Sequence, residues 1–134
     1  MRFILALAAL CFSCQSANAQ ASCAKDADLS QSLVLAKNDQ RLFVEPDPKT
    51  RRVGDLFTLT VTLCDQNSQL TKVNAVMPSH GHGMNYRPSI SKLEAGRFAA
   101  EGLLFHMPGL WELRIETTTG DKGEKFQAEF MIEP

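Results

Sequence analysis

The sequence predicts an all-β protein, an immunoglobulin-like β-sandwich of about seven or eight antiparallel strands that follows a cleaved signal peptide. Apolar residues alternate with polar ones at a period of two rather than 3.6, which gives each strand one buried and one wet face. Clusters of Gly, Pro, Asn and Asp separate these runs at the spacing typical of a sandwich. The ~115 residues that follow the signal peptide suit a single domain with one core.

The first 19 residues are predicted to be a secretory signal peptide. Arg2 supplies a positive charge, residues 3–12 are apolar apart from the weakly polar Cys11, and Ala17-Asn18-Ala19 is a small-x-small cleavage site. The apolar run is shorter than the ~20 residues that cross a bilayer. We therefore expect residues 20–134 to form one domain that is periplasmic or secreted, with no membrane span in the mature chain.

Eight candidate strands follow in chain order. They are residues 33–35, 42–45, 56–63, 73–76, 90–93, 98–104, 111–115 and 126–132. The clearest alternation is Trp111, Leu113 and Ile115 between charged residues, and in the strand 56–63 the apolar positions begin with Leu56. Turn residues occupy 37–39, 46–48, 66–68, 94–96, 107–109 and 120–123. No helix of consequence is expected after the signal peptide.

Two cysteines remain after cleavage, Cys23 near the new N-terminus and Cys64 at the end of a predicted strand. An even number of cysteines in an exported chain favours a disulfide. The bridge would close a loop of about 40 residues and stabilise the fold by ~3 to 4 kcal/mol. The competing interpretation is a pair of copper-binding thiols, although the spacing does not resemble a Cys-x-x-Cys pair.

Charge and motifs exclude several classes of function. The mature chain carries 13 basic and 15 acidic side chains, a formal charge near −2, and its longest basic run is Arg51-Arg52. A nucleic-acid binder or a polybasic membrane binder needs a stronger positive patch. The sequence has no Gly-x-Ser-x-Gly elbow, phosphate loop or His-Glu-x-x-His helix. We therefore expect a protein that is not an enzyme.

The densest set of metal-ligating side chains lies in residues 77–84, Met-Pro-Ser-His-Gly-His-Gly-Met. Imidazole and thioether groups together suit copper, Cu(I) especially, better than calcium or magnesium. Pro78 ends the preceding strand because it has no N–H to donate. The two glycines of this segment allow His80, His82 and Met84 to converge, and Met77 is a further candidate, although it continues an inward-facing alternation and would serve equally well in the core.

The third histidine, His106, precedes Met107 at the end of another predicted strand. Loops gather at the two ends of a sandwich, so His106 meets the first segment if the two strand ends point the same way. In a regular strand His106 and Met107 would face opposite sides, and both could join one site only beyond the strand end. Trp111 is predicted to be a core anchor, with a cation–π contact to bound Cu(I) as the alternative.

Two resemblances to known families follow from these segments. Met84 and His106 are separated by 21 residues, which is similar to the Met-x21-His-x-Met arrangement of periplasmic Cu(I) chaperones for cytochrome oxidase, although here Met107 follows His106 directly. Residues 77–84, 96–98 (Gly-Arg-Phe) and 105–113 (Phe-His-Met-Pro-Gly-Leu-Trp-Glu-Leu) resemble the YtkA-like family, related to FixH-like proteins, over roughly residues 53–132. This second resemblance implies an exported bacterial immunoglobulin-like domain linked to metal handling, mostly copper.

The sequence therefore predicts an exported copper-binding protein, a periplasmic Cu(I) chaperone or buffer that exchanges the ion with a donor or acceptor protein of the envelope. The predicted ligands are His80, His82 and Met84, completed by His106 and by Met77 or Met107. The alternative is a non-metal protein-interaction module of the cell envelope that uses the same loop for contacts. A zinc site built from the three histidines is the less favoured metal site.

Overall fold

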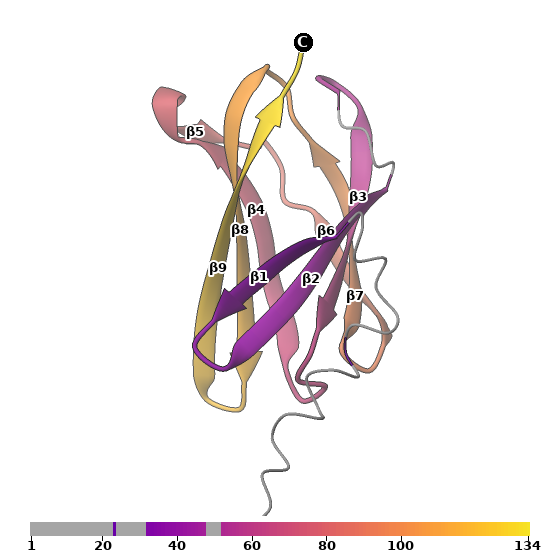
Figure 1. Ribbon diagram of the computed structural model, residues 1–134. Coiled ribbons are helices and arrows are strands. Elements are labelled where there is room, and N and C mark those ends of the chain that lie inside the picture. The colour runs from indigo at the N-terminus through magenta and orange to yellow at the C-terminus, as the bar shows by residue number, and fades with distance from the viewer. Residues whose placement is uncertain (1–22, 24–31, 48–51) are drawn as a thin grey trace, which may run out of the picture.

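The structure is a computed structural model that describes residues 23, 32–47 and 52–134. Two antiparallel sheets pack face to face (Figure 1). The first has the order β1-β2-β3-β7-β6 and the second β5-β4-β8-β9. The strands are β1 (Leu33–Lys37), β2 (Gln40–Asp47), β3 (Leu56–Leu63), β4 (Gln69–Met77), β5 (His82–Gly83), β6 (Ser89–Glu94), β7 (Arg97–Leu104), β8 (Gly109–Thr119) and β9 (Lys122–Ile132). The predicted signal peptide lies outside the described residues.

The strand order is that of an immunoglobulin domain. Strands β2, β3, β7 and β6 correspond to the A, B, E and D strands of that fold, and β4, β8 and β9 to the C, F and G strands. Strand β5 is an extra edge strand beside β4, and β1 is an extra edge strand beside β2. The predicted all-β sandwich is thereby confirmed.

The eight predicted strands all form, and the structure adds one short strand. Strand β5 and the single 3-10 turn η1 (Pro78–His80) lie in the segment that the sequence predicted to be a loop. In β3 Leu56 is 65% exposed, whereas the neighbouring Phe57 is buried. The alternation of β3 therefore begins at Phe57 and continues through Leu59.

The core lies between the two sheets and is dominated by large apolar side chains. Trp111, Phe105, Leu103, Leu113 and Ile115 are each no more than 1% exposed. The ring of Phe105 contacts those of Phe57 and Trp111 in tilted arrangements, with centroids 5.1 Å and 5.0 Å apart. Such aromatic contacts add to the burial free energy of each ring, and the sequence-based expectation that Trp111 belongs to the core is confirmed.

Cys23 and Cys64 form the predicted disulfide, with their Cα atoms 5.1 Å apart. The bridge ties the N-terminal part of the chain to the end of β3. We call this end of the sandwich the disulfide end; it also carries the polar turns at residues 38–39, 64–68, 95–96 and 120–121. The opposite end carries η1, β5, residues 105–108 and the C-terminus (Figure 1), and we call it the histidine end.

Candidate functional site

The histidine-rich segment is a hairpin at the edge of the second sheet. Strand β4 ends at Met77, the turn η1 begins at Pro78, and β5 then pairs antiparallel with β4. Gly81 closes the turn in the left-handed conformation, with φ +67°, and its N–H donates to the carbonyl of Met77 at 3.0 Å. Glycine adopts this conformation with little cost. The sequence-based prediction that Pro78 ends the strand is therefore confirmed.

The register of this hairpin places three candidate ligands on one face. Met77 lies directly opposite His82, and residues directly opposite each other in an antiparallel pair point to the same side. The N–H of Met84 donates to the carbonyl of Ala75 at 3.1 Å, which extends the pairing by one residue. Since Met84 is two residues after His82, it points to that side as well. Met77, His82 and Met84 therefore share the inner side of the β4–β5 edge.

The second half of the site follows β7. Gly102, with φ +83°, is the extra residue of a β-bulge opposite Phe57 and Thr58. Before the bulge the inward-facing residue is the even-numbered Ala100. After the bulge the inward-facing residues are the odd-numbered Leu103 and Phe105. His106 and Met107 lie beyond the end of β7 and before β8. The face alternation of a regular strand therefore places no restriction on these two side chains.

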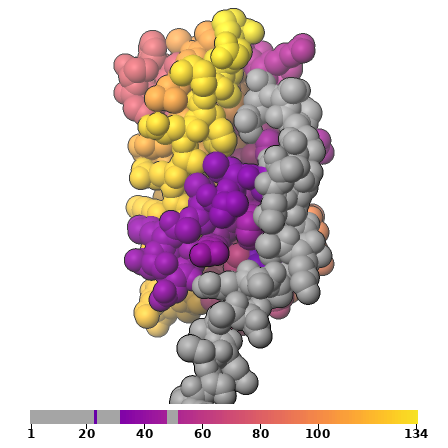
Figure 2. Space-filling model, viewed as in Figure 1, coloured from indigo at the N-terminus to yellow at the C-terminus, as the bar shows by residue number. Residues whose placement is uncertain are grey.

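The two segments meet through a row of rings. The centroid of the His82 ring lies 5.6 Å from that of His80 and 5.4 Å from that of His106. His106 in turn makes an edge contact with Trp111, at 5.2 Å and 81° between planes. The indole N–H of Trp111 donates to the carbonyl of Met107 at 3.0 Å, which fixes the residue next to His106. Figure 2 shows the η1–β5 segment and the adjoining β8 and β9 segments at the same end of the surface.

This spacing suits imidazoles that share one metal ion. A metal–nitrogen bond of ~2.0 Å puts the ring centroid ~3.2 Å from the metal, so two imidazoles on one ion have centroids ~5 to 5.5 Å apart. In the described part of the chain, however, no group of three His, Cys, Asp or Glu side chains could hold a metal ion. The His82 and His106 rings are stacked, with 30° between their planes. Metal capture therefore requires rotation of these side chains or a thioether ligand.

The methionines lie on the core side of the histidines. Met77 is 2% exposed, whereas Met84 and Met107 are partly buried and pack against the core. A Cβ atom on Gly109, whose φ is +124°, would lie 2.6 Å from the terminal methyl carbon of Met77. The absence of a side chain at Gly109 thus makes room for Met77. The inward alternation expected for Met77 is confirmed; Gly109 was predicted only as part of a turn.

Lysine side chains are unevenly distributed between the two ends of the molecule. Every described lysine lies in the half of its strand or turn nearer the disulfide end, namely Lys37, Lys72, Lys92, Lys122 and Lys125. Near the histidine end Glu112 forms an ion pair with Arg114, and Glu133 follows β9. Arg52 and Arg87 lie in the turns before β3 and β6 at the same end. The turns of the disulfide end also carry acidic side chains, Asp39, Asp65 and Asp121. The lysines are therefore confined to the disulfide half, whereas acidic and basic side chains occur at both ends.

Apolar side chains are also exposed at the histidine end. Leu110 and Met131 lie opposite each other on β8 and β9 and are 38% and 62% exposed, and Leu56 begins β3 at this end. The turns of the disulfide end are polar by contrast.

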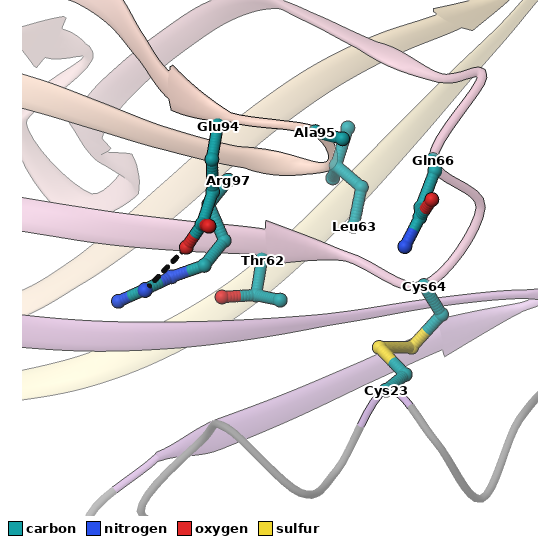
Figure 3. A pocket seen from close by; sticks show the side chains of 8 residues that line it. All are labelled: Cys23, Thr62, Leu63, Cys64, Gln66, Glu94, Ala95 and Arg97. Atoms are coloured by element: carbon teal, nitrogen blue, oxygen red, sulfur yellow. Dashed lines mark hydrogen bonds and ion pairs between the residues drawn. A yellow bond between two sulfur atoms is a disulfide. The ribbon is translucent and has the colours of Figure 1, made fainter.

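Two hollows in the described part lie away from the histidines. One, of ≈340 Å³, lies beside the disulfide and is lined by Cys23, Thr62, Leu63, Cys64, Gln66, Glu94, Ala95 and Arg97 (Figure 3). Within it Arg97 Nη1 forms an ion pair with Glu94 at 2.8 Å. The other, of ≈450 Å³, lies on the outer face of the second sheet between Lys72, Arg114 and Lys125. Neither hollow contains a histidine or a methionine.

No family model, curated protein or solved structure matches this chain. Within the described residues, no helix has the length and apolar character needed to cross a membrane.

Proposed function

We propose that this chain is an exported copper-binding protein that acts as a periplasmic Cu(I) chaperone or buffer. The observation that carries the proposal is the contact between the His82 and His106 rings, which joins two segments more than 20 residues apart into one histidine cluster. Thioether groups of Met77 and Met84 lie on the same side of the hairpin as His82. A mixed set of imidazole and thioether ligands favours Cu(I) over harder cations.

The position of the cluster suits exchange of the ion with another protein. His80 and His82 are exposed, and β5 forms only two residue pairs with β4. Short, exposed elements open at low free-energy cost, so an incoming ligand can replace the imidazoles one at a time. The disulfide is consistent with an oxidising compartment outside the cytoplasm.

A competition titration of Cu(I) tests the proposal. The purified chain, with its disulfide intact, is titrated against a chromogenic Cu(I) chelator, alongside the triple variant His80→Ala/His82→Ala/Met84→Ala. We expect one tightly bound ion per chain and a loss of affinity of at least about 100-fold in the variant. Equal, weak binding by both proteins would remove the basis of the proposal. Tighter Zn(II) than Cu(I) binding, with little effect of Met84→Ala, would instead indicate the three-histidine zinc site.

A protein-interaction module that binds no metal is the second candidate. The observation in its favour is the exposed apolar group at the histidine end, Leu56, Leu110 and Met131, because large exposed apolar side chains in one region are typical of contact surfaces. The titration separates the two candidates, since a module of this kind would bind no copper at equimolar protein. The substitution Leu110→Ser/Met131→Ser should leave the Cu(I) affinity unchanged if copper binding is the function.

A further inference from the structure

In the described part of the chain, the two sheets end in four edge strands, and three of them are short or irregular. Strand β1 has five residues and β5 has two. In β6 the register with β7 shifts between Lys92 and Glu94. Strand β9 is different, because its eleven residues pair with β8 without a register shift and include no proline. Short strands and irregular pairing keep an edge from accepting another strand, so β9 is the edge that lacks this protection.

The main chain of β9 directs every second residue away from β8. In an antiparallel pair, residues that bond to the neighbouring strand alternate with residues whose N–H and C=O groups point away from it. The carbonyl of Lys125 accepts a hydrogen bond from Lys37 Nζ of β1 at 3.3 Å and therefore belongs to the second kind. By the same alternation, the N–H and C=O groups of Gln127, Glu129 and Met131 point to the outer side of β9. Within the described residues no strand pairs with that side.

The β1–β2 turn covers one part of this edge. Asn38 Nδ2 donates to Glu124 Oε1 at 3.0 Å, and Lys37 Nζ lies 3.6 Å from the other carboxylate oxygen of Glu124. These contacts hold the turn against residues 124–125. Figure 2 shows the C-terminal part of β9, in yellow, at the surface of the molecule. A further strand can therefore pair with β9 from its middle towards its C-terminal end.

The exposed side chains along this edge are self-complementary. Lys125, Gln127 and Glu129 are exposed and lie on the outer face of the sheet. When a second β9 runs in the opposite direction with the two Gln127 residues opposite each other, Lys125 of each copy lies opposite Glu129 of the other copy. Opposite charges at such positions stabilise a strand pair, whereas a pairing centred on Glu129 would bring two carboxylates together. The charge pattern therefore favours a second copy of this chain, in one register.

We propose that the chain forms a homodimer in which β9 pairs antiparallel with β9 of a second copy, centred on Gln127. A two-fold axis repeats every contact, as is usual for a dimer of identical chains. The two four-stranded sheets join into one continuous sheet, and Lys125 and Glu129 make two ion pairs between the copies. A main-chain bond replaces the bond from Lys37 to the Lys125 carbonyl, while Lys37 keeps Glu124 as its partner.

The dimer leaves the histidine segment accessible. Strand β5 lies at the edge of the second sheet opposite to β9. The two-fold axis also places the histidine ends of the two copies at opposite ends of the joined sheet. The inference is therefore independent of the proposed copper binding, and its test is made on the metal-free chain.

Charge reversal tests the interface on the purified chain, with its disulfide intact and with a metal chelator present. Sedimentation equilibrium gives the dissociation constant of the dimer for the unmodified chain, for Lys125→Glu, for Glu129→Lys and for the double variant Lys125→Glu/Glu129→Lys. Each single reversal puts like charges opposite each other at two positions and should weaken the dimer at least about tenfold. The double variant restores opposite charges and should return to within about threefold of the unmodified chain. Lys92→Glu, which makes the same charge change on the β6 edge, is the matched control and should have no effect.

A cysteine at the centre of the interface tests the register. In the proposed pairing the two Gln127 residues lie opposite each other, with their Cα atoms ~5.5 Å apart, which is within the range of a disulfide. Gln127→Cys should therefore form a disulfide-linked dimer on oxidation. Ser91→Cys, at an exposed position of the β6 edge, should remain monomeric on the same non-reducing gel.

Two results would overturn the inference. A chain that stays monomeric up to about 1 mM has no such interface, and the β9 edge would then be left to a strand from a different protein. A dimer that is unaffected by the single reversals and is not cross-linked by Gln127→Cys uses another surface. The unfolding midpoint in urea identifies a variant with a damaged fold, and recovery in the double variant shows that the single reversals act through the interface.

Discussion

Gly109→Ala tests how the Met77 side chain is held in place. Gly109 has φ +124°, and a Cβ atom there would lie 2.6 Å from the terminal methyl carbon of Met77. A non-glycine residue in such a region costs ~1 to 3 kcal/mol. Moving the Met77 side chain away from its rotamer costs a further ~0.5 to 1.5 kcal/mol. We therefore expect the free energy of unfolding, measured in urea on the metal-free chain, to fall by ~1.5 to 4.5 kcal/mol.

Gly102→Ala is the matched control for this experiment. Gly102 also has a positive φ, +83°, but its Cβ position has no atom within 4 Å, so only the backbone cost applies. The difference between the two variants measures the contact with Met77. That difference should disappear in a Met77→Ala background, where the clashing methyl group is absent. Equal effects of Gly109→Ala and Gly102→Ala, or a difference that persists without Met77, would show that the contact with Met77 does not destabilise the Gly109 variant.

Three further changes give distinct expected results. The buried hydroxyl of Thr117 has no hydrogen-bond partner in the described part of the chain. Thr117→Val should therefore leave the urea midpoint unchanged or raise the free energy of unfolding by up to ~1 kcal/mol. A clear decrease in that free energy would reveal a partner for the hydroxyl. Cys23→Ala/Cys64→Ala, or reduction of the disulfide, should lower the free energy of unfolding by ~4 kcal/mol for a sequence separation of 41 residues. An unchanged unfolding midpoint in urea would contradict this value. In Gly83→Ala the new Cβ atom would lie 2.9 Å from the carbonyl oxygen of Ala75 and would push β5 away from β4. This variant should therefore bind Cu(I) about tenfold more weakly in the chelator assay. Gly120→Ala, at the disulfide end, should have no effect on that affinity.

Much of the fold was predictable because the strands carry a strong period of two. In β8, Trp111, Leu113 and Ile115 are buried as their alternation predicted. In β3 the neighbours Leu56 and Phe57 are both apolar, and it is Phe57 that alternates in step with Leu59 and is buried. A period of two determines which residues share a face of the strand. Where two neighbouring residues are both apolar, however, it does not determine which of them faces the core.

The site was predictable in composition but only partly in geometry. The sequence placed the histidines in two segments, and their meeting depended on strand direction, which follows from the antiparallel order β4-β8. The bulge at Gly102 shifts the inward phase of β7 by one residue, and the only sequence feature that points to it is a glycine inside a predicted strand. Strand β5 has two residues, too few to show a period. The space that Gly109 leaves for Met77 depends on the packing of β4 against β8, which no local pattern encodes.

The covalent cross-link and the candidate metal ligands lie at opposite ends of the sandwich. The disulfide lies at the end of β3 opposite the histidine cluster, so the covalent constraint does not restrict the segments that carry the candidate ligands. Those segments are held by the two residue pairs between β4 and β5 and by ring contacts around Trp111. Trp111 is fully buried and bonded to the Met107 carbonyl, which makes the His106 side of the cluster the firmer one. The η1–β5 side is therefore the one expected to open at the lower free-energy cost.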